Sequence, residues 1–91
     1  MPQDRITVTI ALFAIYRDAF GVERLEREFP PQTPVKAVLE QLIAERPELA
    51  PWRELTDLGI GDGFVPPDTH LRDGDEVVLI PPVSGGSPQP Q

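Results

Sequence analysis

Residues 76–80 form the run that most narrows the possible folds of this chain. In a strand, Val77 and Leu79 would point to one face and Val78 and Ile80 to the other, so both faces would be apolar. Such a run is typical of a strand in the middle of a sheet, with a neighbouring strand on each side. We therefore predict that a central strand of a sheet lies close to the C-terminus.

The first 30 residues predict two strands that pair with each other, joined by a short helical turn. Residues 5–12 alternate between polar and apolar side chains, which is the period of a half-buried strand. Residues 16–20 favour a short helical turn, which Gly21 would end by adopting a positive φ. Residues 22–29 then predict a strand that pairs back on the first. The apolar side of the first strand comprises Ile6, Val8, Ile10 and Leu12.

One clear helix follows, with Thr33 expected as its N-cap and Pro34 as its first helical residue. Its apolar residues have the spacing of a single stripe that faces a core, and Pro47 should stop it. This stripe comprises Val35, Val38, Leu39, Leu42 and Ile43.

The remaining segments predict short elements. Residues 51–58 are expected to form a turn of helix packed on the sheet through Trp52, Leu55 and Leu58. Residues 58–67, rich in glycine and proline, suggest a short edge strand with an irregular exit. The dipeptide 73–74 (Asp-Gly) favours a turn before the final strand.

A hairpin, a crossover helix, short strands and a central closing strand together predict an α+β fold of the β-grasp (ubiquitin-like) type. The mixed sheet would have four to five strands around one main helix, and the closing strand would lie parallel to the first. Residues 1–86 would make up this domain. Residues 87–91 (Ser-Pro-Gln-Pro-Gln) have no side chain suited to packing and are expected to form a flexible extension.

Composition argues against several classes of function. The chain has no cysteine, so it has neither a disulfide nor a thiol nucleophile. Its net charge of -7 argues against nucleic acid as a partner and favours a basic protein surface. The longest apolar run, 77–83, is far shorter than a membrane span. We expect a cytoplasmic protein with no membrane partner.

Conventional catalysts and cofactor sites are scarce. His70 is the only histidine and is expected to be a solvated loop residue. The aspartates between residues 57 and 75 lack the spacing of a calcium loop, so no metal site is predicted. The glycines at 59, 61 and 63 resemble a phosphate loop, but Asp62 would repel phosphate and no helix is expected to follow. Turn geometry is the better interpretation, and we predict no catalytic residue and no bound cofactor.

The C-terminal segment is the feature that points to a function. Pro81 and Pro82 would end the last strand, and the four residues 83–86 (Val-Ser-Gly-Gly) could reach roughly 13 Å beyond the domain. Gly85 and Gly86 carry no side chains, so they could thread a narrow channel and present an unhindered carbonyl carbon. A Gly-Gly pair near a terminus is often only a linker, but its position directly after a closing strand favours a probe that enters the active site of another protein.

These residues resemble the MoaD family, the small subunits of molybdopterin synthase, within the wider MoaD/ThiS group of ubiquitin-like sulfur carriers. The resemblance rests on the run 73–77 (Asp-Gly-Asp-Glu-Val) and on 79–86 (Leu-Ile-Pro-Pro-Val-Ser-Gly-Gly). It implies a carrier cycle: an E1-like enzyme of the MoeB type would use ATP to adenylate the Gly86 carboxylate, and sulfur would then replace AMP to give a thiocarboxylate.

The resemblance also implies how the carrier meets its acceptor. Pro81, Pro82, Val83, Ser84 and Gly85 would enter the large, MoaE-like subunit, and the sheet face near Phe64 would pack against that partner, although Phe64 could equally be a core or edge residue. Sulfur would then pass to a pterin precursor for molybdenum cofactor biosynthesis.

Two departures from the family pattern qualify this prediction. Many relatives carry an asparagine-containing strand where residues 58–67 stand here. Ser87 follows Gly86, so a processing protease, for instance of the JAMM type, would have to cut there first. The alternatives are a sulfur carrier for thiamine, tRNA thiolation or cysteine, a ubiquitin-like protein modifier, and a β-grasp binding module that has lost activation.

Overall fold

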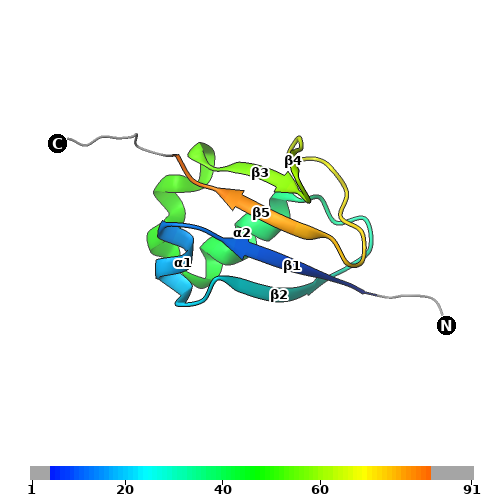
Figure 1. Cartoon of the computed structure of the whole chain (residues 1–91), viewed down its shortest axis with the longest axis horizontal. Helices are drawn as coiled ribbons and strands as arrows, with labels where there is room; N and C mark the ends of the chain where they lie inside the picture. Colours follow the sequence, from blue (N-terminus) through cyan, green and yellow to red (C-terminus); the bar gives the residue numbers. More distant parts are fainter. Residues whose placement is uncertain (1–4, 83–91) are drawn as a thin grey trace.

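Strands and helices form largely where the apolar periodicity predicts them. The computed structural model describes residues 5–82, and Figure 1 shows the arrangement of their elements. In chain order these are β1 (Ile6–Leu12), α1 (Ile15–Phe20), β2 (Arg24–Phe29), α2 (Lys36–Glu45), the 3-10 helix η1 (Pro47–Leu55), β3 (Asp57–Ile60), β4 (Gly63–Phe64) and β5 (Glu76–Ile80). No helix among these residues is long and apolar enough to cross a membrane.

The five strands form one mixed sheet in the order β2-β1-β5-β3-β4. β5 is central and parallel to β1, whereas the other neighbouring pairs are antiparallel. The central position and the parallel pairing of β5 confirm the prediction. Val77 and Leu79 are fully buried against the helices, but Val78 and Ile80 on the opposite face are only partly covered. The outer face of β5 is therefore less deeply buried than its inner face, although both faces are apolar.

The turn before β5 ties the strand to its parallel neighbour. Gly74 has a φ of +87°, which favours glycine, and its N–H donates to the Thr7 carbonyl at 2.8 Å. The Asp73 carboxylate accepts the Thr7 N–H at 2.8 Å. The predicted Asp-Gly turn is confirmed, and its contacts with β1 fix the parallel register.

The apolar stripe of α2 is buried as predicted, but the start of the helix differs. The helix begins at Lys36, and Thr33 does not cap it: the Thr33 hydroxyl donates to the Pro30 carbonyl instead, at 2.6 Å. Segment 33–35 pairs with segment 69–71 through hydrogen bonds that include Leu71 N–H to the Thr33 carbonyl at 2.8 Å. These long-range backbone bonds hold Thr33 and Pro34 outside the helix.

The helical turn predicted over 51–58 is longer and begins earlier, at Pro47. Leu49 is its buried anchor, Trp52 packs partly against the core, and Leu55 is 57% exposed. Leu58 belongs to β3. Together η1 and α2 cover the inner face of the sheet (Figure 1), so the outer face has no helix on it within residues 5–82.

The glycine-rich segment forms the β3–β4 hairpin, with Gly61 at a φ of +65° in its two-residue turn. Gly59 lies opposite Phe64, and a Cβ atom at Gly59 would lie 3.1 Å from the Gly63 carbonyl oxygen. The glycine at position 59 therefore allows the hairpin to close tightly. Turn geometry, rather than phosphate binding, accounts for two of the three glycines.

Tyr16 joins α1 to η1 inside the molecule. Its side chain is fully buried, and its hydroxyl is hydrogen-bonded to the Thr56 hydroxyl, which donates to the Trp52 carbonyl at 2.8 Å. Because a hydroxyl has one proton, Tyr16 is the donor to Thr56. Burial raises the pKa of Tyr16 above its usual 10.0.

This raised pKa predicts a loss of stability in alkali. The folded chain keeps the Tyr16 proton where the unfolded chain releases it, so the stabilising contribution is complete below about pH 10 and is lost as the pH rises toward the folded-state pKa. We expect the free energy of unfolding to fall as the pH rises above about 10, and to fall less in Tyr16→Phe. Urea unfolding of both proteins measures this difference, and parallel pH dependences would contradict it.

Candidate docking face

The C-terminal segment leaves the domain at the end of the central strand. β5 ends at Ile80, Pro81 is buried and Pro82 is exposed. Proline has no N–H to donate to a neighbouring strand, so the pair closes β5 at this point. The predicted tail residues Val83, Ser84, Gly85 and Gly86 lie outside the described residues, as do residues 87–91. The described structure therefore places the base of the tail.

The outer face of the sheet carries a row of small and apolar residues next to this exit. The strand registers set Ala11 beside Val78, Val78 beside Gly59, and Gly59 beside Phe64, so the row crosses four strands. Phe64 is 71% exposed, the largest exposed fraction among the big hydrophobic side chains of the described chain. Phe64 is therefore not a core residue, but it does lie on an edge strand, β4, so the alternative of an edge residue is confirmed.

A shallow hollow of about 130 Å³ lies on this face beside Phe64. Val78 and Ile80 line it from β5, and the β3–β4 hairpin supplies the rest of the wall, including Gly59 and Asp62. A partner side chain of moderate size could enter it. We call this surface, defined by Ala11, Gly59, Phe64, Val78 and Ile80, the docking face.

Charged groups border the docking face. Arg24 of β2 and Glu76 of β5 form an ion pair of 2.8 Å. This ion pair spans β1, the strand that lies between β2 and β5. Asp57 lies opposite Ile80, and both Asp57 and Asp62 are exposed. The face thus has an apolar centre and a rim with two exposed carboxylates, which matches a partner surface with an apolar anchor and basic residues around it.

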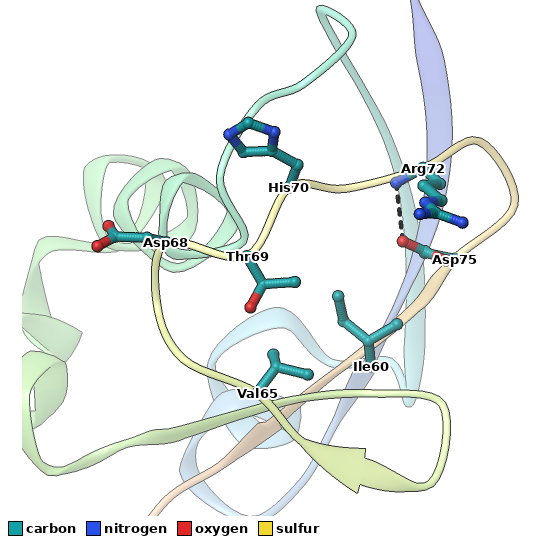
Figure 2. A pocket seen from close by; sticks show the side chains of 7 residues that line it. All are labelled: Ile60, Val65, Asp68, Thr69, His70, Arg72 and Asp75. Atoms are coloured by element: carbon teal, nitrogen blue, oxygen red, sulfur yellow. Dashed lines mark hydrogen bonds between the residues drawn. The ribbon is translucent and has the colours of Figure 1, made fainter.

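A wider, open hollow of about 610 Å³ lies elsewhere, beside the loop that precedes β5. Figure 2 shows Thr69 pointing into this hollow and His70 pointing away from it. His70 is exposed, as predicted, and Asp75 accepts the Arg72 N–H at 2.8 Å. Within residues 5–82, no three histidine or acidic side chains gather closely enough to hold a metal ion. This hollow adjoins the start of β5, at the opposite end from Pro81.

Sequence reasoning named Phe64, Pro81 and Pro82 as candidate site residues but did not name the other residues of the docking face. Ala11, Gly59 and Val78 come from three separate strands, and only the register brings them together. The alternation of residues along β1 and β5 indicated which side chains share a face, but the sequence held no signal for their alignment across strands.

Three curated relatives align with most of this chain, and all three are named molybdopterin synthase sulfur carrier subunit. The protein from Mycobacterium tuberculosis is 33% identical, covering 89% of this chain and 99% of the relative. The Chlamydomonas reinhardtii protein is 32% identical over 87% and 98% of the two chains, and the Arabidopsis thaliana protein is 27% identical over 89% and 84%.

Solved structures share the fold. The HVO 2177 protein of Haloferax volcanii superimposes with a TM-score of 0.80 at 25% identity, covering 94% of this chain and 92% of that one. The small archaeal modifier protein 1 of Methanosarcina acetivorans gives 0.71 at 25% identity, covering 90% and 98%. A Caldiarchaeum subterraneum ubiquitin gives 0.60 at 21% identity, covering 90% and 99%, a likeness of fold alone. These likenesses confirm the ubiquitin-like β-grasp fold.

The sequence profile of the ThiS family matches residues 10–86, a span that begins in β1 and runs to the second glycine of the pair. It therefore includes the docking face, the closing strand and Gly86. On this match, and on the identity with the curated relatives over almost their full length, the chain belongs to the ThiS family.

Proposed function

We propose that the chain is a non-catalytic sulfur carrier of the molybdopterin synthase small-subunit type, which carries sulfur as a thiocarboxylate on Gly86. The observation that supports this most strongly is the family match, which extends to Gly86, together with the shared name of three relatives that align over 84–99% of their length. The central strand β5 ends directly before Pro81, so the fold supplies a rigid base for the proposed tail.

The chemistry requires activation by another protein. A carboxylate resists nucleophilic attack because its carbonyl carbon is electron-rich and oxide is a poor leaving group. An E1-like enzyme of the MoeB type would join the Gly86 carboxylate to the AMP part of ATP, with release of pyrophosphate. The outer sulfur of a persulfide on a donor protein would then attack the carbonyl carbon and displace AMP, which gives an acyl disulfide. A second thiol would cleave the S–S bond of this acyl disulfide, forming a disulfide with the donor's sulfur and leaving the thiocarboxylate on Gly86. The chain itself binds no cofactor in this scheme; the activating enzyme uses the ATP.

The docking face would hold a large subunit of the MoaE type while the tail enters its active site. Phe64 supplies the exposed aromatic anchor, and the hollow beside it would receive a side chain of the partner. Because β5 runs directly from this face to Pro81, docking and tail insertion are mechanically linked. Sulfur would pass to the pterin precursor of the molybdenum cofactor.

The Gly86 carbonyl must first be freed. In the sequence it is bonded to the Ser87 nitrogen as an amide, which cannot be adenylated. Hydrolysis of this bond by a processing protease, for instance of the zinc-dependent JAMM type, would release Ser87 and the residues beyond it. We place this cleavage before adenylation.

Complementation tests the pathway. In a host that lacks its own molybdopterin synthase small subunit, a gene encoding the chain up to Gly86 should restore the activity of molybdenum enzymes, and a gene that stops at Ser84 should not. Co-expression of the activating enzyme and large subunit from the chain's own source removes the problem of mismatched partners. Failure of the Gly86 form with these partners would contradict the molybdopterin assignment.

A second candidate is a ubiquitin-like protein modifier, favoured by the structural likeness to the small archaeal modifier protein 1 of Methanosarcina acetivorans. The activated Gly86 would then form an isopeptide bond with a lysine of another protein. Peptide mass spectrometry of the native host should find the C-terminal remnant on target lysines. Lys36 is the only lysine of this chain, so only one linkage type to a lysine side chain is open to self-conjugation.

A further inference from the structure

The strand β2 forms one outer edge of the described sheet. The Leu12 N–H donates to the Glu23 carbonyl at 2.9 Å, which fixes the pattern of the antiparallel β1–β2 ladder. Because backbone groups alternate in direction along a strand, residues 25, 27 and 29 bond toward β1, and residues 24, 26 and 28 point outward. Glu26 and Glu28 therefore direct their carbonyls away from the sheet.

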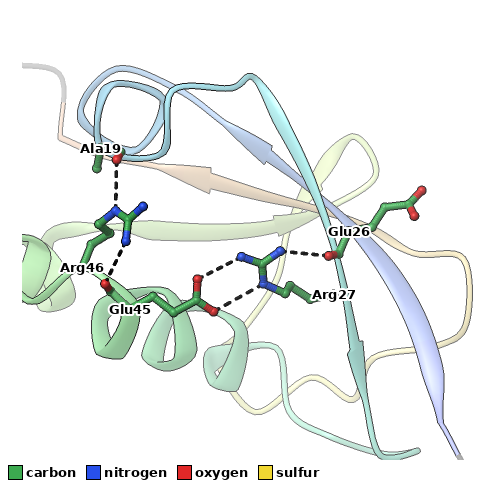
Figure 3. Close-up of polar contacts among 5 residues, drawn as sticks. All are labelled: Ala19, Glu26, Arg27, Glu45 and Arg46. Carbon is green, nitrogen blue, oxygen red and sulfur yellow. Dashed lines mark hydrogen bonds and ion pairs between the residues drawn. The ribbon is translucent and has the colours of Figure 1, made fainter.

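Arginine side chains bind both of these outward carbonyls. Arg27 Nη1 donates to the Glu26 carbonyl at 3.0 Å, and Arg5 Nη2 donates to the Glu28 carbonyl at 3.0 Å. Figure 3 shows how Glu45 of α2 fixes Arg27: Nη2 lies 2.9 Å from one carboxylate oxygen and Nε lies 3.4 Å from the other. Arg5 is held by the Glu28 carboxylate, with Nε 3.3 Å from Oε1.

We propose that Arg5 and Arg27 close the β2 edge against pairing with β2 of a second copy of this chain. An open strand edge is a template for another strand, and natural proteins protect such edges with charged groups. The Arg27 guanidinium is preorganised by its two contacts with Glu45, so it occupies the Glu26 carbonyl that an incoming N–H would need.

The sequence of β2 identifies a second copy as the fitting partner. In an antiparallel pair of two β2 strands with Leu25 opposite Leu25, each Arg24 lies opposite Glu26 of the other copy. In this register the outward residues 24 and 26 form hydrogen-bonded pairs, so the Glu26 carbonyl would accept the Arg24 N–H of the partner copy. Both contacts use the outward-pointing Glu26 carbonyl, so the Arg27 guanidinium bonded there lies on the side from which the partner strand would approach.

The double variant Arg5→Ala/Arg27→Ala tests this inference, with sedimentation equilibrium as the readout. We expect self-association to strengthen by roughly tenfold or more relative to the unmodified chain. Lys36→Ala/Arg53→Ala is the matched control, because it removes the same charge from two exposed, ion-paired residues outside β2. This control should associate no more strongly than the unmodified chain.

Adding Glu26→Pro to the double variant locates the contact. Proline removes an N–H that points outward, so it blocks a new strand without removing a bond to β1. We expect it to reverse the association. A folded double variant that stays as monomeric as the control overturns the proposal, and so does a dimer that survives Glu26→Pro. If the double variant does not fold, Glu45→Gln replaces it in the test, because this substitution releases Arg27 and leaves β2 unaltered. We expect Glu45→Gln to strengthen self-association. A Glu45→Gln chain that is as monomeric as the unmodified chain overturns the proposal.

Discussion

A chain that ends at Gly86 should be adenylated by its E1-like enzyme, and the chain that continues to Gln91 should not. The expected effect is all or none, because the first chain presents a carboxylate to ATP and the second presents an amide at the same carbon. Pyrophosphate exchange into ATP measures the step directly. We expect exchange above background for the Gly86 chain alone when the purified enzyme is free of protease.

A chain that ends at Ser84 is the matched control for this experiment. It has a free C-terminal carboxylate on the same folded domain, but it lacks the two glycines and is shorter by roughly 7 Å of extended chain. We expect no exchange, which would show that the glycine pair is needed in addition to a free terminus. Equal exchange by the Gly86 and Gln91 chains would refute the requirement for cleavage.

The second large effect is expected at Phe64. Phe64→Asp replaces the exposed aromatic anchor of the docking face with a charge, and loss of an anchor of this kind weakens binding by about 2 to 4 kcal/mol, or roughly 30- to 1000-fold in Kd. Titration calorimetry with the purified large subunit measures the change. Because the Phe64 side chain is 71% exposed, the substitution should leave the domain folded.

Leu55→Asp is the control for Phe64→Asp. Leu55 is also a large, exposed hydrophobic residue, but it lies on η1, in the helical layer that covers the inner face of the sheet. We expect the large subunit to bind this variant as tightly as the unmodified chain. If both variants bind normally, the partner uses a different surface.

Local patterns predicted the strands and the buried helical stripe because their signals lie within single segments. β1 and β5 follow from alternation and from a doubly apolar run, and Gly21 and Gly74 mark turns through positive φ. Thr33 was mispredicted as a cap because its backbone bonds to Leu71, a residue far along the chain. A pattern within one segment cannot show a hydrogen-bond partner that lies so far along the chain.

The same reason explains what was missed at the docking face. The row from Ala11 to Phe64 exists only through the pairing of four strands, and the exposure of Val78 depends on helices that cover one face and leave the other open. Pro81 and Pro82 were found because prolines after a strand mark its end in the sequence itself. Tail residues 83–86 lie outside the described structure, so their role stays a prediction.

The intact mass of the protein purified from its native host tests the central claim most directly. We predict a chain that ends at Gly86, with a fraction heavier by the exchange of one oxygen for one sulfur, and a larger fraction when the sulfur acceptor is depleted. A chain that retains Ser87 and the residues after it under every sulfur supply would contradict the proposal that Gly86 is the working end.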